Sequence, residues 1–518
     1  MASALPRTAR VAVIGAGAMG IGIVQVAAQA GHPVALFDVR DGAAAAAVAT
    51  LRQRLAELAI KGRITQHTAD TASERIAAVD TLAGCASAEL VIEAIVEDLD
   101  AKRALVRELD TLVASTTIIA SNTSSLSITA IAGGSRHPAR VAGMHFFNPA
   151  TVMPLVEIVS GLATDAEVAT TLYATAAAWQ KTPVHAQSTP GFIVNRCARP
   201  YYGEALRLLS EHAADVATLD AVMRDAGGFR MGPFELMDLI GLDVNFATTQ
   251  SVWKGYFHDP RYAPSFLQRE MVDAGLLGRK SGRGFYDHAP GATMPAPATE
   301  PACPPPSRVV VYGELGAAAA LVERMQDGGA KIEFVGETSP TMPGINGVIG
   351  AGGAWLALTD GRTATARAAA TGARELVVFD LALDFATCAR IAVARADSCS
   401  DAAYAAAVGA LQGAGVAVSR LDDVAGLAVM RSVCMLANEA ADALREGIAS
   451  ADAIELAMRK GVNYPRGPLA WADAIGLLRV RDVLAHLGAH YGEDRYRISP
   501  WLARCAAAGA PLAGKHHG

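Results

Sequence analysis

The stretch that most constrains the fold is a glycine-rich loop between a short strand-like run and a helical pattern. Arg10 to Ile14 is the strand-like run, Gly15, Gly17 and Gly20 form the loop, and the helical pattern ends at Gly31. In the order strand, G-x-G-x-x-G, helix, the glycines permit a tight turn and let backbone N–H groups approach a pyrophosphate at the helix N-terminus. The segment predicts a Rossmann-type domain that binds a dinucleotide.

The residue after the second strand indicates which dinucleotide. A glycine fingerprint alone is weak evidence in a chain rich in alanine and glycine, but Pro33 to Phe37 is another strand-like run and ends in Asp38. A carboxylate at this place accepts hydrogen bonds from the adenine ribose hydroxyls and repels a 2′-phosphate. NAD is therefore favoured over NADP, with Arg40 as the competing signal for NADP.

A histidine and a glutamate accompany two further strand-like runs. His145 follows the apolar-rich run Val141 to Met144, and Glu157 lies inside the run Leu155 to Val159. An imidazole whose far nitrogen is held by a carboxylate is a general base with a fixed tautomer. The alternative is a core histidine beside an unrelated glutamate, and these residues alone do not decide between the two.

Polar residues also end two other predicted strands. Glu89 to Val96 is apolar except for Glu93 and is followed by Glu97, with Lys102 about one helical turn further on. The next strand-like run delivers the polar cluster Ser121 to Ser125. Polar groups at the carboxyl ends of parallel strands face the ligand crevice of an open α/β sheet. We expect a functional role for the cluster, although a turn with an N-cap would need none.

Composition excludes several other classes of protein. The 518 residues are enough for about three or four domains, and 52% apolar with 19% charged residues indicates a well-cored globular protein. A net charge of −6 suggests neither nucleic acid nor an anionic membrane as a partner. Seven scattered cysteines show no metal-ligand spacing, so we expect reduced cytoplasmic thiols and no metal site. We expect neither a signal peptide nor a membrane-spanning segment.

The whole chain divides into five segments. We expect a Rossmann domain over residues 1–188, a helical domain over 189–287, a proline- and alanine-rich linker over 288–307, a degenerate α/β domain over 308–423 and a second helical domain over 424–518. Gly350 to Gly353 imitates a dinucleotide loop, but Trp355 occupies the third fingerprint position, so we treat the loop as a decoy.

The second helical domain repeats the first at a spacing of 235 positions. Ala425 to Arg431 aligns with Pro190 to Arg196, and Gly467-Pro468 aligns with Gly232-Pro233. Met430 stands where the first copy has Asn195. We therefore expect the second helical domain to have a structural rather than a catalytic role.

Five segments together resemble the L-3-hydroxyacyl-CoA dehydrogenases over nearly all of residues 8–287. They are SNTSSL from Ser121, HFFNP from His145, PGFIVNR from Pro190, MGPFELMDLIGLD from Met231 and GRKSGRGFY from Gly278. The resemblance implies oxidation of the 3-hydroxyl of an acyl-CoA to a ketone, with hydride passing to NAD. The layout with two helical domains resembles the longer bacterial members linked to phenylacetate and 3-hydroxyadipyl-CoA breakdown, in which an internal pseudo-dimer of helical domains is expected and a further homo-oligomer is left open.

The resemblance also implies roles for individual residues. His145 matches the general base, Glu157 the carboxylate that orients it, and Ser124 and Asn195 the groups that bind the reacting oxygen and the thioester region. The cofactor positions are Gly15, Gly17, Gly20 and Asp38 on the adenine side, and Glu97, Lys102, Asn122, Asn148 and Lys280 on the nicotinamide side.

A predicted long helix from Ala43 to Arg63 carries the residues expected at CoA. Lys61 matches the CoA-contacting lysine of the family, whereas Arg54 stands where a serine is common in the family. An ordinary solvated face would account for both charges as well. The alternatives for the whole chain are a 3-hydroxybutyryl-CoA dehydrogenase of short-chain metabolism, a dehydrogenase of a free hydroxy acid, and a non-catalytic NAD-binding protein on the same fold.

Overall fold

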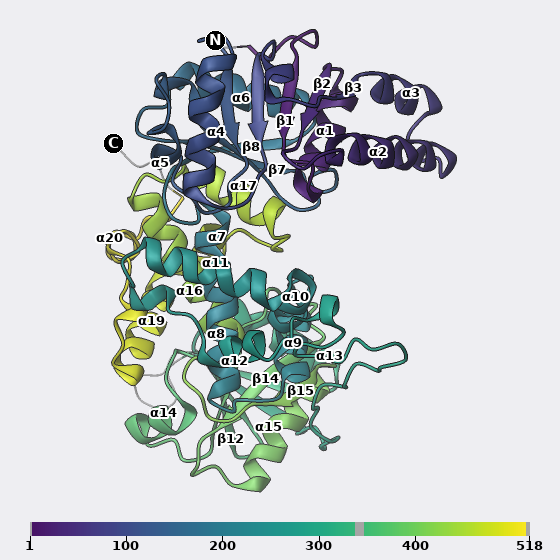
Figure 1. Cartoon of the computed structure of the whole chain (residues 1–518). Coiled ribbons are helices and arrows are strands. Elements are labelled where there is room, and N and C mark those ends of the chain that lie inside the picture. Colours follow the sequence, from purple (N-terminus) through teal and green to yellow (C-terminus); the bar gives the residue numbers. More distant parts are fainter. Residues whose placement is uncertain (1–2, 337–346, 514–518) are drawn as a thin grey trace. The chain divides into compact units, whose positions relative to one another are not determined.

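The computed structural model describes residues 3–336 and 347–513, and the chain forms two compact units (Figure 1). Unit 1 holds Met1–Arg196 together with Glu446–Val462, and unit 2 holds Cys197–Arg445 together with Asn463–Gly518. The first unit therefore contains a segment from the far end of the sequence. Each unit is described by itself.

Unit 1 is built on an eight-stranded sheet in the order β3-β2-β1-β4-β5-β6-β7-β8. Its strands are β1 (Val11–Ile14), β2 (Val34–Phe37), β3 (Ile76–Ala78), β4 (Leu90–Glu93), β5 (Ile118–Ser121), β6 (Val141–Phe146), β7 (Leu155–Ser160) and β8 (Thr182–Gln187). All neighbours run parallel except β6 and β7, which are antiparallel. The reversal at β7 places His145 directly opposite Glu157 in the register.

The strands of unit 1 are buried because helices cover the sheet. One apolar core joins Val11 and Ile92 of the strands to Ile23, Val48 and Leu172 of three helices. Such continuous burial explains why β1 and β4 are short apolar runs rather than alternating ones. The helices of this unit are α1 (Ala18–Ala30), α2 (Ala43–Ile60), α3 (Gln66–Glu74), α4 (Leu99–Leu112), α5 (Ile128–Ala132), α6 (Ala166–Ala178), the start of α7 (Val194–Cys197) and α17 (Ala451–Gly461).

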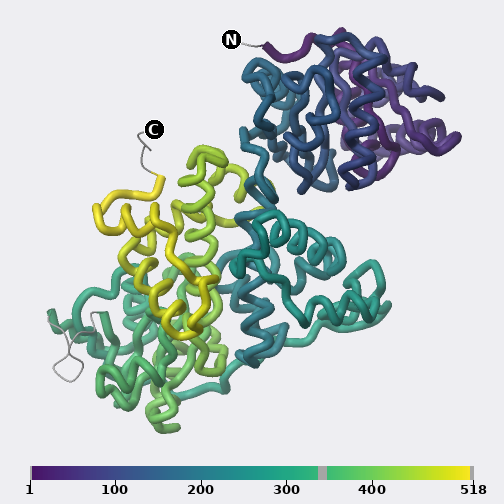
Figure 2. The backbone as a smooth tube through the Cα atoms, turned by 60° about the vertical axis from the view of Figure 1, so that its left-hand side comes forward, coloured from purple at the N-terminus to yellow at the C-terminus, as the bar shows by residue number. Residues whose placement is uncertain are grey.

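Unit 2 contains two sets of helices that lie side by side, the first teal and the second lime to yellow in Figure 2. The first set is α8 (Arg199–Ser210), α9 (Val216–Asp225), α10 (Pro233–Ile240), α11 (Leu242–Gly255) and α12 (Phe266–Asp273). The second set is α16 (Val429–Arg445), α18 (Pro468–Ile475), α19 (Leu477–Tyr491) and α20 (Pro500–Ala508). Helix α8 packs on α16.

A seven-stranded sheet in the order β10-β9-β11-β12-β13-β14-β15 completes unit 2. Its strands are β9 (Arg308–Tyr312), β10 (Lys331–Val335), β11 (Val348–Ala351), β12 (Ala354–Leu358), β13 (Leu376–Phe379), β14 (Arg390–Arg395) and β15 (Ala417–Arg420), and its helices are α13 (Ala319–Asp327), α14 (Ala364–Thr371) and α15 (Asp401–Gly413). The decoy prediction for Gly350 to Gly353 is confirmed, because β11 and β12 pair as an antiparallel hairpin around this loop.

The structural repeat extends further upstream than the sequence repeat. Strands β13, β14 and β15 and helix α15 begin 235 positions after β6, β7, β8 and α6. The last part of the second sheet is therefore a copy of the last part of the first. Few identical residues survive in this copy, because a buried strand needs only a run of apolar residues.

Two predicted elements are shorter than expected. The strand predicted over Glu89–Val96 ends at Glu93, so Glu97 lies in the loop before α4, whose N-terminus is capped by the side chain of Asp98. The helix predicted from Ala43 to Arg63 ends at Ile60. At the start of the helical domain, the chain from Thr189 to Leu209 contains two helices, α7 and α8. Gly191 and Phe192 have left-handed backbone conformations before α7, and Pro200 lies in the first turn of α8, where its missing N–H is tolerated.

Candidate active site

The glycine loop of unit 1 has the shape that a pyrophosphate needs. Gly15 has φ +107°, and a Cβ there would lie 2.5 Å from the carbonyl oxygen of Ala94. A Cβ on Gly20 would strike the carbonyl oxygen of Gly15, whereas a Cβ on Gly17 would meet nothing within 4 Å. Two glycines thus permit close backbone packing, and the third leaves open space at the N-terminus of α1. The chain's own loop fits a dinucleotide.

Asp38 follows β2 beside this loop. Its Oδ2 accepts a hydrogen bond from the N–H of Ala16 at 2.7 Å, and its Oδ1 accepts one from Nε of Arg40 at 2.9 Å. Arg40, followed by the N–H of Ala16, holds the pKa of Asp38 well below its ordinary value even though partial burial acts in the opposite direction. The carboxylate is therefore ionised, and the Arg40 side chain that covers it is 70% exposed.

His145 on β6 and Glu157 on β7 form a buried pair. Nδ1 of His145 lies 2.7 Å from Oε2 of Glu157, and the two residues are 5% and 0% exposed. The rings of Phe147 and Phe192 lie beside the imidazole, with centroids at 4.5 and 5.9 Å. Because Nδ1 faces the carboxylate, Nε2 is the ring nitrogen that can exchange a proton with another molecule.

Glu157 also holds the segment that carries Asn195. Its Oε1 accepts hydrogen bonds from the N–H groups of Ile193 at 3.1 Å and Val194 at 3.0 Å, at the start of α7. The amide Nδ2 of Asn195 donates to the carbonyl oxygen of Ser124 at 3.3 Å. The structure thus brings together all four residues that the sequence singled out for chemistry.

The loop of Ser124 is held by Glu97. Oε1 of this carboxylate accepts hydrogen bonds from the Thr123 hydroxyl at 2.6 Å and from the N–H of Ser124 at 3.0 Å, and Oε2 lies 3.4 Å from Nζ of Lys102. Burial by itself would raise the pKa of Glu97, but Lys102 and these donors outweigh it, so the pKa lies below its ordinary value. An ionised Glu97 therefore orders the loop.

Glu93 is a partner that the sequence analysis missed. Its carboxylate lies 2.8 Å from Nζ of Lys102, and both side chains are 1% exposed. The hydroxyl of Ser121 also donates to Glu93. The sequence does contain a signal for this pair. Glu93 interrupts an apolar strand, and a buried charge requires a partner, which Lys102 offers nine positions later.

The other predicted site residues lie in different surroundings. Oδ1 of Asn122 accepts the N–H of Phe146 at 2.8 Å, which ties together two strand ends, and Asn148 is exposed after β6. Arg54 and Lys61 are exposed at the C-terminal end of α2, where Lys61 lies 3.7 Å from Glu57. Lys280 belongs to unit 2, in which its Nζ lies 2.5 Å from Asp243.

The copied sheet of unit 2 lacks these groups. Asp380 stands where the first sheet has His145, Ala392 where it has Glu157, and Met430 where the first copy has Asn195. Both oxygens of Asp380 accept backbone N–H groups, among them those of Val429 at 2.7 Å and Met430 at 2.9 Å. A carboxylate at the position of the histidine has thus taken over the anchoring of the helix.

Among residues 3–336 and 347–513, no group of three or more histidine, cysteine, aspartate or glutamate side chains could hold a metal ion. No helix in the part of the chain that the structure describes is both long enough and apolar enough to cross a bilayer.

Models of known families match most of the chain. The model of the 3-hydroxyacyl-CoA dehydrogenase NAD binding domain matches residues 10–189, and that of the C-terminal domain matches residues 191–288 and again 426–516. The chain belongs to the 3-hydroxyacyl-CoA dehydrogenase family. A third model, the 3-hydroxybutyryl-CoA dehydrogenase reduced Rossmann-fold domain, matches residues 356–424, which include the copied strands.

Individual members of the 3-hydroxyacyl-CoA dehydrogenase family resemble the chain over different lengths. A 3-hydroxyadipyl-CoA dehydrogenase of Escherichia coli is 43% identical over 94% of this chain and 95% of that protein. A probable 3-hydroxybutyryl-CoA dehydrogenase of Bacillus subtilis is 43% identical over 54% of this chain and 97% of that protein. A crystal structure of a 3-hydroxybutyryl-CoA dehydrogenase from Escherichia coli has a TM-score of 0.87 and 41% identity, and covers 97% of this chain and 98% of that chain. The chain is thus an NAD-dependent oxidoreductase of this family.

Proposed function

We propose that the chain oxidises the 3-hydroxyl of an L-3-hydroxyacyl-CoA to the 3-ketoacyl-CoA. The observation that carries the proposal is the shared carboxylate of Glu157, which lies 2.7 Å from Nδ1 of His145 and accepts the N–H of Val194 beside Asn195. One buried side chain therefore sets both the base and the group that binds the reacting oxygen. General-base catalysis of this kind contributes roughly 10²- to 10⁴-fold.

Each residue has a defined role in the proposed reaction. Nε2 of His145 removes the hydroxyl proton, and Glu157 stabilises the imidazolium that results. The Asn195 amide and the Ser124 hydroxyl donate hydrogen bonds to the oxygen as it becomes a carbonyl. NAD, when bound, supplies the acceptor for the hydride that leaves C3.

The remaining site residues are proposed to bind cofactor and CoA. Gly15, Gly17, Gly20 and Asp38 would hold the adenine side, which is supported by the open space at Gly17. Glu97, Lys102, Asn122, Asn148 and Lys280 would serve the nicotinamide side. The exposed cations Arg54 and Lys61 would receive the phosphates of CoA.

The acyl group and compartment are also proposed from supporting observations. We propose a role in phenylacetate or adipyl-CoA breakdown, or in β-oxidation more generally. The name of the 3-hydroxyadipyl-CoA dehydrogenase that matches 94% of this chain supports the adipyl-CoA assignment. The second candidate is a 3-hydroxybutyryl-CoA dehydrogenase, which the similar crystal structure favours. A reducing cytoplasm is supported by the seven cysteines, all of which are free thiols.

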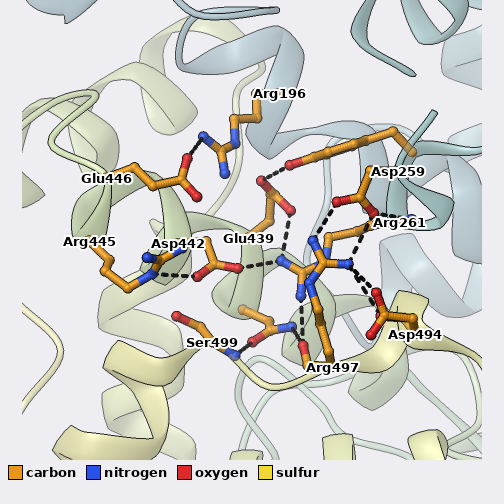
Figure 3. Close-up of polar contacts among 12 residues, drawn as sticks. Arg196, Asp259, Arg261, Glu439, Asp442, Arg445, Glu446, Asp494, Arg497 and Ser499 are labelled. Carbon is orange, nitrogen blue, oxygen red and sulfur yellow. Dashed lines mark hydrogen bonds and ion pairs between the residues drawn. The ribbon is translucent and has the colours of Figure 1, made fainter. Parts of the chain in front are cut away.

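We further propose that the two helical domains, residues 189–287 and 424–518, form an internal pseudo-dimer, with residues 288–307 as linker, 1–188 as NAD-binding domain and 308–423 as degenerate domain. Reciprocal contacts support it. The Tyr262 hydroxyl donates to Glu439 at 2.6 Å, and the Tyr496 hydroxyl donates to Glu204 at 2.8 Å. Arg261 of the first helical domain also pairs with Asp442 of the second (Figure 3), and its Nη1 lies 2.5 Å from Oδ2 of Asp442.

The deciding experiment follows NADH absorbance with the purified full chain. The substrates are 3-hydroxybutyryl-, 3-hydroxyhexanoyl- and 3-hydroxyadipyl-CoA, with free 3-hydroxybutyrate as the control without CoA. We expect turnover with the thioesters and at least a hundredfold lower kcat/KM with the free acid. Folded, NAD-binding protein without turnover on any thioester would instead identify a non-catalytic NAD-binding protein, and equal rates with the free acid would identify a hydroxy acid dehydrogenase.

A further inference from the structure

A segment of the second helical domain, residues 424–518, is part of unit 1. Residues 446–462 connect to unit 2 at both ends, yet they belong to the unit that contains the candidate active site. Helix α17 of this segment packs on β7 and β8, beside which it lies in Figure 1. The N–H of Gln187 at the end of β8 donates to the carbonyl oxygen of Ile448 at 2.8 Å.

This segment contacts both sequence neighbours of Asn195. Nη1 of Arg196 lies 2.6 Å from Oε2 of Glu446, and the Arg196 side chain is 2% exposed. On the other side of Asn195, α17 packs so closely that a Cβ on Gly461 would lie 3.0 Å from Cγ2 of Val194 and 2.6 Å from Cδ2 of Leu155. Glu446 and Gly461 therefore hold the turn that carries Asn195.

That turn needs external support. Helix α7 has four residues, and a helix of this length is not stable by itself because its nucleation is unfavourable. Glu157 holds its first N–H groups from the sheet. The segment 446–462, which lies far from α7 in the sequence, provides a second contact. Two independent restraints therefore act on the turn that carries Asn195.

The second half of the chain contains the same restraint without the chemistry. Arg431 and Glu211 occupy the positions equivalent to Arg196 and Glu446, and Nη1 of Arg431 lies 3.1 Å from Oε2 of Glu211. The N–H of Asp422 donates to the carbonyl oxygen of Ala213 at 2.8 Å, as Gln187 does to Ile448. Met430 takes the place of Asn195 there. Each helical copy thus supplies a restraint to the other half, and only one restraint lies beside a candidate catalytic residue.

We propose that Glu446 and Gly461 are positioning residues for the reaction, acting through Arg196 and Val194 on the amide of Asn195. The second helical domain then contributes residues that position the active centre, in addition to its structural role. This inference rests on the proposed function, because it concerns the group that binds the reacting oxygen. A misplacement of such a group by about 1 Å can cost up to about a hundredfold in rate.

The test compares Glu446→Gln with the matched control Glu211→Gln. Both variants remove one carboxylate charge from equivalent pairs. We expect Glu446→Gln to lower kcat about tenfold while the KM for NAD stays within twofold, and Glu211→Gln to keep kcat within twofold. Gly461→Leu, which forces Val194 and Leu155 apart, should lower kcat in the same way. Equal loss of kcat in Glu446→Gln and Glu211→Gln would overturn the proposal.

A second measurement needs no turnover. Hydrogen exchange of the backbone amides of Ile193 to Arg196 should be at least fivefold faster in Glu446→Gln than in the unmodified chain, and unchanged in Glu211→Gln. If the unmodified chain fails to oxidise any thioester, the proposed function fails, whereas the exchange rates still decide whether Glu446 restrains this turn. Unchanged exchange in Glu446→Gln would refute the restraint whatever the activity.

Discussion

Asp380 of the second sheet occupies the position that His145 occupies in the first sheet. The two residues are 235 positions apart. His145 lies on β6 and Asp380 directly follows β13, and each of these strands has an antiparallel neighbour. His145 faces a carboxylate, whereas Asp380 is itself the carboxylate and accepts the N–H groups of Ala428 and Val429. In the first sheet Glu157 does this anchoring from the next strand. The same position thus holds the proposed proton acceptor in one copy and an anchor of backbone N–H groups in the other.

We expect substitutions at these two positions to have opposite consequences. His145→Ala should abolish turnover and leave NAD affinity within about threefold, because the base is not a main cofactor anchor. Asp380→Ala should leave the kcat of folded protein within twofold and lower the free energy of unfolding by about 3 kcal/mol, since several buried N–H groups lose their acceptor. NADH absorbance, NAD titration and urea unfolding measure the three quantities. Joint loss of NAD binding and turnover in His145→Ala would mean that the base is misassigned.

Glu157→Gln should lower kcat by about 10²- to 10⁴-fold. A neutral amide cannot stabilise the imidazolium, and it can also donate a hydrogen bond to Nδ1, which would favour the wrong tautomer. The control is Glu333→Gln, which removes an exposed carboxylate of the degenerate domain and should change nothing. Steady-state kinetics at saturating NAD give kcat directly, and a loss of less than about threefold would separate Glu157 from the reaction.

Asp38→Ser should reduce the preference for NAD over NADP. The substitution removes the ionised carboxylate beside the glycine loop and releases Arg40, which can then pair with a 2′-phosphate. We expect the ratio of kcat/KM values for the two cofactors to fall by at least about tenfold, corresponding to about 1.4 kcal/mol. Adding Arg40→Ala to Asp38→Ser should weaken NADP again. An unchanged ratio in Asp38→Ser would show that other residues select the cofactor.

Glu97→Gln tests the order of the Ser124 loop and its dependence on pH. The pKa of Glu97 in the folded chain lies below its ordinary value of 4.5, so its ionised form stabilises the fold above pH 4.5 and this contribution is lost as the pH falls below it. Chemical unfolding from pH 7 to pH 3.5 should therefore show a smaller loss of stability in the variant than in the unmodified chain. Parallel curves would mean that Glu97 contributes nothing to this dependence.

The sequence predicted much of the site because its signals are local. The loop from Gly15 to Gly20, the strand that presents His145 and the strand that presents Glu157 each follow from the spacing of glycine and apolar residues. The sequence missed the pair of Glu93 and Lys102, because it joins the end of a strand to a helix and depends on how the helix packs.

By itself the sequence determined the Rossmann sheet, the NAD loop, the family, the candidate catalytic residues and the duplication of the helical domain. Those features depend on short-range patterns and on repeated motifs. Only the tertiary structure decided that Glu157 serves both His145 and the Asn195 turn, and that Glu446 pairs with Arg196. It also revealed the copied strands from β13 to β15. The physical reason is that sheet register and helix packing bring together residues that are 12 to 250 positions apart, and no local pattern encodes which of them meet.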